Sequence, residues 1–144
     1  MQLKEVMTSS VEVIAPEATI QAAVEKMSDL DIGLLPVCEG ERLVGIVTDR
    51  DITVRAVAEG RSPVTTQVRE VMTPDAIYGF DDQDVEDAAR LMKQYQIRRL
   101  PVLNRRKQLV GMVSLGDLAV HSGQQSLAGE VLEQVSEPET SGRT

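Results

Sequence analysis

Apolar residues recur at helical spacing in two stretches of the chain, and each stretch follows a residue that caps helices well. The pattern predicts helices over Ile20–Leu30 and Val85–Tyr95, where apolar side chains return every three or four positions. Thr19 and Asp84 directly precede these stretches and are the expected N-caps, because their side-chain oxygens accept hydrogen bonds from free N–H groups of the first turn. The two predicted helices begin 65 residues apart, which is the first indication of an internal repeat.

Short runs rich in Val, Leu and Ile, separated by polar turns, surround these helices and predict strands. The predicted strands are Val11–Ile14, Leu35–Cys38, Leu43–Thr48, Ala76–Phe80, Leu100–Leu103 and Leu109–Ser114. A second helix is expected after each hairpin. The first starts at Asp49–Asp51 and runs through Ile52–Ala58, and the second starts near Gly116-Asp117 and runs through Leu118–Val120. The order is therefore β-α-β-β-α, twice, which is an α/β (α+β) fold of two repeats related by pseudo-two-fold symmetry.

The repeat is also visible residue by residue. Val6-Met7-Thr8 returns as Val71-Met72-Thr73, and Leu35-Pro36-Val37 returns as Leu100-Pro101-Val102, both at an offset of 65 residues. The block that starts at Leu43 returns at Leu109, at an offset of 66. We expect a first repeat at 1–60, a linker at 61–70, a second repeat at 71–121, and a C-terminal helix and tail at 122–144.

Composition and charge restrict the function further. The chain has 144 residues and a formal net charge of -8, which disfavours nucleic-acid binding because that mode needs clustered Lys and Arg. No apolar run approaches the roughly 20 residues that span a bilayer, so a soluble cytoplasmic protein without a membrane partner is expected. The single histidine, His121, and the single cysteine, Cys38, supply no catalytic or metal-binding constellation. The composition therefore predicts neither an enzyme nor a metal site, and Cys38 is expected as a small buried residue.

The landmarks of the repeat resemble the CBS domain, named for cystathionine β-synthase. They are the Met-Thr segment, the run Ile-x-x-Leu-Pro-Val, and the run Gly-hydrophobic-Val-Thr/Ser-x-x-Asp, each present twice and in order over residues 5 to 120. The chain is similar to small stand-alone bacterial proteins that consist of one CBS pair, or Bateman module. The resemblance implies a flat homodimer that binds AMP, ADP or ATP, or S-adenosylmethionine, in clefts between the repeats, and that signals to a protein partner. Many members have no known ligand.

Two motifs, Thr48-x-x-Asp51 and Ser114-x-x-Asp117, allow two interpretations. A hydroxyl and an acidic residue three positions later at a helix start form a capping box, which needs no ligand. The same geometry offers free N–H groups to a phosphate and a carboxylate to a ribose, and the resemblance assigns ribose and phosphate contacts to these positions. The two interpretations can coexist.

Arg98-Arg99 precedes the second Leu-Pro-Val run, and guanidinium groups there could hold a phosphate. Alternatively, both arginines are solvated or paired with carboxylates. The first repeat has Gly33-Leu34 at the matching positions, so Arg50, whose counterpart is Gly116, would have to supply the cation. The two clefts should therefore differ.

By family position, each cleft takes residues from both repeats. One is expected to contain Ala15, Ile20, Arg98, Arg99, Met112, Ser114 and Asp117, and the other Phe80, Val85, Ile46, Thr48, Arg50 and Asp51. Their apolar members are expected to be core residues with an exposed edge, and Phe80 either stacks on a base or lies at the core rim. The acidic run Asp81–Asp87 favours the positive end of the following helix over a divalent cation. A ligand-free interaction module is the alternative to a nucleotide sensor.

Overall fold

The computed structural model describes residues 1–121 of the chain, and the predicted C-terminal helix and tail at 122–144 lie outside the described residues. The chain divides into two compact units. The first-copy unit is Glu12–Ala76, and the second-copy unit combines Met1–Val11 with the chain from Ile77 onward. Both units contain helices and a three-stranded sheet, which confirms the predicted α+β class.

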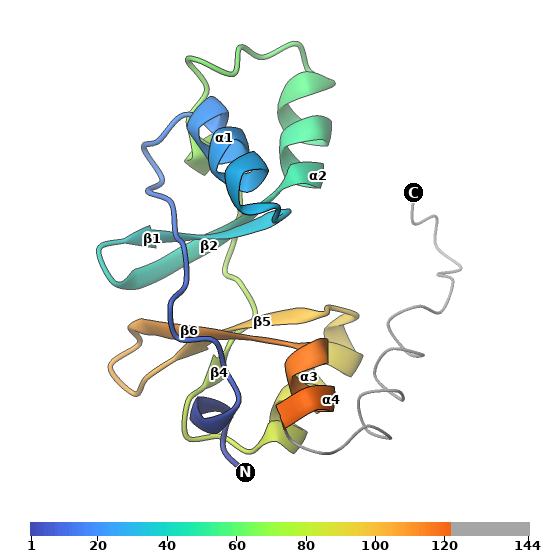
Figure 1. Cartoon of the computed structure of the whole chain (residues 1–144). Coiled ribbons are helices and arrows are strands. Elements are labelled where there is room, and N and C mark those ends of the chain that lie inside the picture. Colours follow the sequence, from blue (N-terminus) through green and yellow to red (C-terminus); the bar gives the residue numbers. More distant parts are fainter. Residues whose placement is uncertain (122–144) are drawn as a thin grey trace. The chain divides into compact units, whose positions relative to one another are not determined.

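The first-copy unit has the sheet order β1-β2-β3, with antiparallel neighbours. Figure 1 labels its strands β1 and β2. Its elements are α1 (Ile20–Leu30), β1 (Leu34–Glu39), β2 (Arg42–Thr48), α2 (Asp49–Ile52), the π-helix η2 (Thr53–Val57), the 3-10 turn η3 (Val68–Glu70) and β3 (Thr73–Pro74).

The second-copy unit has the sheet order β4-β5-β6, in which β4 runs parallel to β5 and β6 antiparallel to it. Its elements are the 3-10 turn η1 (Leu3–Glu5), β4 (Gly79–Phe80), α3 (Val85–Tyr95), β5 (Arg99–Leu103), β6 (Leu109–Ser114) and α4 (Leu115–His121).

The two long helices begin and end at the predicted residues, because caps mark both ends. The Thr19 hydroxyl accepts a hydrogen bond from the Ala22 N–H at 3.1 Å, and Asp84 forms a capping box with Asp87. At the other end, Asp31 and Gln96 adopt left-handed backbone conformations with φ of 53° and 54°. That conformation ends a helix, since it turns the following backbone away from the helix axis.

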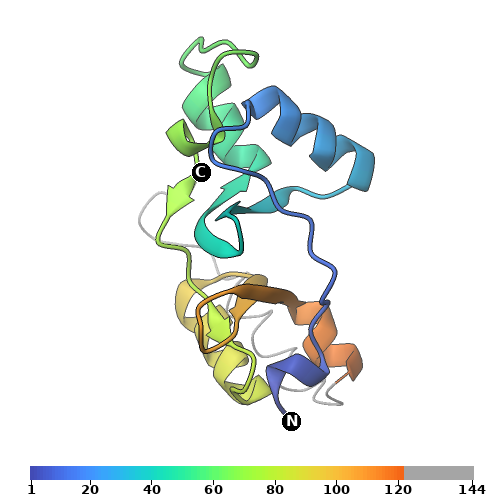
Figure 2. The ribbon, with the colours of Figure 1, turned by 90° about the vertical axis from the view of Figure 1, so that its left-hand side faces the viewer.

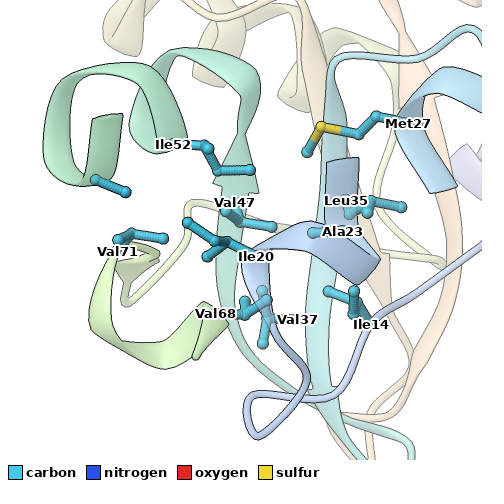
Figure 3. Packing of buried hydrophobic residues seen from close by; sticks show 11 residues of the cluster. Ile14, Ile20, Ala23, Met27, Leu35, Val37, Val47, Ile52, Val68 and Val71 are labelled. Atoms are coloured by element: carbon cyan, nitrogen blue, oxygen red, sulfur yellow. The ribbon is translucent and has the colours of Figure 1, made fainter. Parts of the chain in front are cut away.

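Each unit has its own aliphatic core on one face of its hairpin. In the first-copy unit, Leu35, Val37 and Val47 point from β1 and β2 toward Ile20 and Ala23 of α1 (Figure 3). In the second-copy unit, a matching cluster joins both helices to the hairpin. Its fully buried members include Val85, Ala88, Met92, Leu100, Val102, Val113 and Leu118. The remaining residues of each strand alternate with the core residues, and their side chains project from the opposite face of the hairpin.

Each Met-Thr segment packs against the hairpin of the other sequence copy. Thr8 pairs with Met112 of β6 through two backbone hydrogen bonds of 2.9 Å, which adds the chain start to the second-copy unit (Figure 2). Likewise, Thr73 and Pro74 of β3 pair with Ile46 and Gly45 of β2. The sequence repeat and the compact unit therefore divide the chain differently.

Glycine is needed where these segments cross the hairpins. A β-carbon on Gly111 would lie 2.4 Å from Met7 Sδ, and one on Gly45 would lie 2.8 Å from Met72 Sδ. Glycine has no β-carbon, so it fits at both positions where a larger residue does not. In each contact, the methionine of one sequence copy packs against the glycine of the other copy.

Two of the predicted strands are wrong or shortened. Within Val11–Ile14 only Ile14 pairs, in an isolated bridge to Val37, and the Val13 carbonyl accepts a hydrogen bond from the Lys26 ammonium instead of a strand. The run Ala76–Phe80 shrinks to the two residues of β4. Neither segment has a neighbouring strand along its whole length, so it does not form a full strand despite the β propensity of its residues.

The second helix of the first copy also differs from the prediction. It begins at Asp49, as predicted, but from Thr53 it widens into a π-helix, closed by an Ala58 N–H···Thr53 carbonyl bond of 2.9 Å. The Thr53 hydroxyl also donates to the Asp49 carbonyl at 2.9 Å.

The segment expected as a linker, 61–70, is part of the body of the first-copy unit. Thr66 and Val68 are buried, and Arg61 pairs with Glu70. The backbone hydrogen bond that the Gln67 N–H donates, followed by the Arg61 guanidinium, lowers the pKa of Glu70.

Candidate functional site at the strand–helix junctions

Both Thr/Ser-x-x-Asp motifs form reciprocal capping boxes at the point where a hairpin strand becomes a helix. Thr48 Oγ1 accepts from the Asp51 N–H at 3.0 Å while Asp51 Oδ2 accepts from the Thr48 N–H at 2.9 Å. Ser114 and Asp117 repeat the arrangement at 3.1 and 2.8 Å. The capping interpretation is thus confirmed at both motifs, and each box uses one carboxylate oxygen.

The other oxygen of Asp51 faces an arginine of the same helical segment. Arg55 lies 3.9 Å from Asp51 Oδ1, and its guanidinium donates to the Val71 and Met72 carbonyls at 3.0 Å each. Only 14% of the Asp51 side chain is exposed. Arg55 thereby joins the first capping box to the segment that leads into β3.

A backbone hydrogen bond fixes a second pair of positions next to each box. The Asp49 N–H donates to the Gly33 carbonyl at 3.0 Å, and the Leu115 N–H donates to the Arg98 carbonyl at 2.9 Å. Position 33 therefore corresponds to 98, and 49 to 115, in structure as well as in sequence. The side chains at these positions differ in charge. The first-copy unit has a glycine beside an aspartate, and the second-copy unit has an arginine beside a leucine.

The cationic candidates all lie near these junctions. Arg99 is exposed and stands opposite Ser114 in the antiparallel register of β5 and β6, so the two side chains project from the same face of the hairpin. Arg98 precedes it and is also exposed. Arg50 follows Asp49, whose Oδ1 accepts from the Arg50 N–H at 2.8 Å.

The apolar candidates differ in their access to ligand. Ile20 and Val85 are buried in the two cores, as expected, whereas Ala15 is exposed. Ile46 and Met112 are half-buried on the hairpin face that carries Thr48 and Ser114 respectively.

Phe80 lies in a polar–aromatic cluster of the second-copy unit. The Arg105 guanidinium carbon is 4.1 Å from the centre of its ring, and Tyr78 meets Phe80 edge to face at 5.5 Å. Asp82 holds Arg105 through two hydrogen bonds of 2.9 and 2.8 Å, and these bonds lower the pKa of Asp82. One face of the ring is therefore occupied by a cation, which agrees with the rim interpretation of this residue.

The structure brings the candidates together in two groups. The second-copy unit holds Arg98, Arg99, Met112, Ser114, Asp117, Phe80 and Val85, and the first-copy unit holds Ala15, Ile20, Ile46, Thr48, Arg50 and Asp51. Each expected cleft combines members of both groups, and its assembly stays a prediction.

Residues 1–121 offer few side chains for metal binding or nucleophilic catalysis. That part of the chain has no group of three or more His, Cys, Asp or Glu side chains able to hold a metal ion. Its helices include none that is long and apolar enough to cross a membrane. Cys38 is buried as expected, and burial raises the pKa of its thiol to about 11, which makes it a poor nucleophile.

Comparison with known families decides the identity of the fold. Residues 3–57 and 68–122 each match the CBS domain. The chain belongs to the CBS domain family. This agrees with the resemblance that the repeated motifs carry.

Several CBS proteins are similar over most of their length. The CBS domain-containing protein YhcV of Bacillus subtilis is 42% identical over 134 residues, which cover 93% of this chain and 94% of YhcV. The crystal structure of Hypoxic Response Protein I with two coordinated zinc ions has a TM-score of 0.77 at 32% identity, covering 84% of this chain and 98% of that one. CBSX2 in complex with AMP has a TM-score of 0.74 at 27% identity, covering 87% of this chain and 98% of that one.

Asp49 and Arg55 were not among the residues selected from the sequence. Asp49 precedes the arginine of the first motif, and a comparison with Leu115 would have marked it as a charge difference between the copies. Arg55 gave no comparable signal, because its partners are carbonyls of a segment far along the chain.

Proposed function

We propose that this CBS pair is a regulatory module that senses an adenosine nucleotide, AMP, ADP or ATP, and has no catalytic activity of its own. The observation that carries the proposal is the junction of the second-copy unit. There Arg98 and Arg99 stand at the start of β5, while Ser114 and Asp117 close the capping box at the end of β6. A phosphate would lie on the two guanidinium groups and the ribose on Asp117.

The charge of this junction suits the ligand. Bidentate guanidinium–phosphate pairs are among the stronger polar contacts in proteins, and two adjacent arginines match a group with two or more negative charges. Asp117 uses Oδ2 for the cap, so Oδ1 remains to accept from ribose hydroxyls. The half-buried Met112, two residues before Ser114, offers an apolar edge to the base. The similarity to AMP-bound CBSX2 supports the same ligand class.

Signalling would follow from a ligand that prefers one of two arrangements of the protein, which a partner then recognises. We propose an isologous homodimer as the signalling form. Support comes from exposed apolar side chains on the helical segments of the first-copy unit: Val24 and Leu30 on α1 and Val54 and Val57 on η2.

The test is calorimetry with AMP, ADP, ATP and S-adenosylmethionine on the wild type and on two matched variants. Arg99→Gln should weaken the binding of AMP at least tenfold, because it removes one of the two phosphate contacts. Arg106→Gln is the control, since it removes the same charge from the exposed turn of the same hairpin and should change affinity less than twofold. If both variants weakened AMP binding equally, the loss would reflect the overall charge of the protein and would contradict a specific phosphate contact at Arg99.

The ligand-free alternative makes a different prediction for Asp117→Ala. Without a nucleotide site, this variant loses only the cap, about 1 kcal/mol of stability, and no ligand responds to it. A folded wild-type protein that binds nothing in the panel would rule out the sensor and leave the interaction module.

A further inference from the structure

The two copies present opposite charges at corresponding positions of the strand–helix junction. The first copy has Gly33 and Leu34 before the Leu-Pro-Val run and Asp49-Arg50-Asp51 after β2. Asp49 therefore has no arginine at position 33 beside it, although Arg50 and Arg55, the latter 3.9 Å from Asp51, add positive charge nearby. The second copy has Arg98-Arg99 and then Leu115-Gly116-Asp117. Two arginines against one aspartate leave a net positive charge.

The aspartate of the first copy occupies the place of the missing side chain. A β-carbon built on Gly33 would lie 2.9 Å from Asp49 Oδ2 and 3.3 Å from its Cγ. The carboxylate therefore covers the backbone at the position where Arg98 carries its side chain in the second copy. Asp49 Oδ1 is held in turn by the Arg50 N–H at 2.8 Å, which restrains the orientation of the carboxylate.

The leucine of the second copy removes this negative charge from the corresponding place. Leu115 is half-buried and packs against the core of its unit, whereas Asp49 is exposed. The shared backbone hydrogen bonds, Asp49 N–H to Gly33 and Leu115 N–H to Arg98, keep the two junctions in the same geometry. The difference between them is thus a difference of side-chain charge rather than of backbone.

We infer that Asp49 is a specificity-determining residue that excludes phosphate from the first copy, so that the chain takes one phosphate-bearing ligand, at the second copy. The inference rests on the proposed nucleotide function and states which copy performs it. At an assumed separation of about 6 Å in a water-like dielectric, a carboxylate would oppose the binding of a dianionic phosphate by about tenfold.

The experiment transfers the charge between copies and measures AMP and adenosine binding by calorimetry. The wild type should bind one AMP per chain. Leu115→Asp should weaken AMP about tenfold and leave adenosine unchanged, because adenosine lacks the phosphate. Leu115→Asn, which loses the same packing but adds no charge, should bind AMP within twofold of the wild type. Circular dichroism shows whether the two variants are equally folded.

Two further variants test the first copy without touching a core. Asp49→Asn keeps an oxygen that accepts from the Arg50 N–H and removes the charge, so a second, weaker equivalent of AMP should appear. Asp49→Glu keeps the charge and should stay at one equivalent. The inference is overturned if Asp49→Asn and Asp49→Glu behave alike, if Leu115→Asp and Leu115→Asn weaken AMP equally, or if the wild type binds two equivalents. In each of those cases nucleotide sensing itself stands, whereas a wild type that binds no nucleotide overturns both.

Discussion

Gly111 has no room for a β-carbon, because the Met7-Thr8 segment lies directly against it. The added carbon of Gly111→Ala would meet Met7 Sδ at 2.4 Å, Met7 Cγ at 2.9 Å and the Thr8 carbonyl oxygen at 2.9 Å. Carbon atoms in good contact stay about 3.5–4.0 Å apart, so Met7 must move by about 1 Å or more. Its flexible side chain can do so, but the Thr8 carbonyl is fixed by the Thr8–Met112 bridge.

The cost follows from the two parts of that clash. Overpacking alone costs about 1–3 kcal/mol. If Thr8 retreats, the two hydrogen bonds of 2.9 Å to Met112 weaken, and each contributes about 0.5–1.5 kcal/mol. We expect Gly111→Ala to lower the free energy of unfolding by about 2–4 kcal/mol. The chain has no Trp, so urea unfolding followed by far-ultraviolet circular dichroism is the suitable assay.

Gly116→Ala is the matched control within the same unit. Its β-carbon would lie 3.6 Å from Ser114 Oγ, an ordinary contact, and the position is helical. Alanine there should stabilise the protein by about 0.5–1 kcal/mol. Adding Met7→Ala to Gly111→Ala should restore part of the lost stability, because it removes the nearer contacts. A Gly111→Ala midpoint at or above that of Gly116→Ala would refute the reasoning.

Two other predictions concern the first-copy unit. Arg55→Met removes the hydrogen bonds to the Val71 and Met72 carbonyls but keeps the aliphatic stem, and should cost about 1–2 kcal/mol in urea unfolding. Arg42→Met, at the exposed first residue of β2, should change stability by less than about 0.5 kcal/mol. Equal losses would contradict the bracing role of Arg55. Because the pKa of Cys38 is raised to about 11, the folded state keeps this proton longer than the unfolded state, so stability should fall as pH rises from about 8.5 toward 11. Cys38→Ala should show a shallower decline over that range, and identical slopes would exclude the thiol as the cause.

The elements whose bounds are set by residues close together in the sequence were predictable from the sequence. Both bounds of α1 and α3 follow from a capping residue and a periodic apolar face, which are local signals. The capping boxes of Thr48 and Ser114 follow from a spacing of three residues.

The features that depend on distant partners were not predictable. Val11–Ile14 has the composition of a strand, but only pairing decides whether a strand forms, and Ile14 alone finds a partner. The repeat shows that Met7 and Gly111 belong to one pattern without showing that they touch, since a sequence match carries no information on which copy packs against which. The approach of Asp49 to Gly33 likewise brings together residues from the two ends of the β1–β2 hairpin.

The division of the chain into units also sets the order in which they can be completed during synthesis. The first-copy unit is one continuous stretch, Glu12–Ala76, so all of its parts have left the ribosome once residue 76 and a tunnel length have been made. Thr8 emerges earlier but meets its partner Met112 only about 100 residues later, which takes roughly 5–20 s at the usual rate of translation. For that interval the segment around Met7 has no β5–β6 hairpin to pack against, whereas the first-copy unit already has all of its residues and can fold.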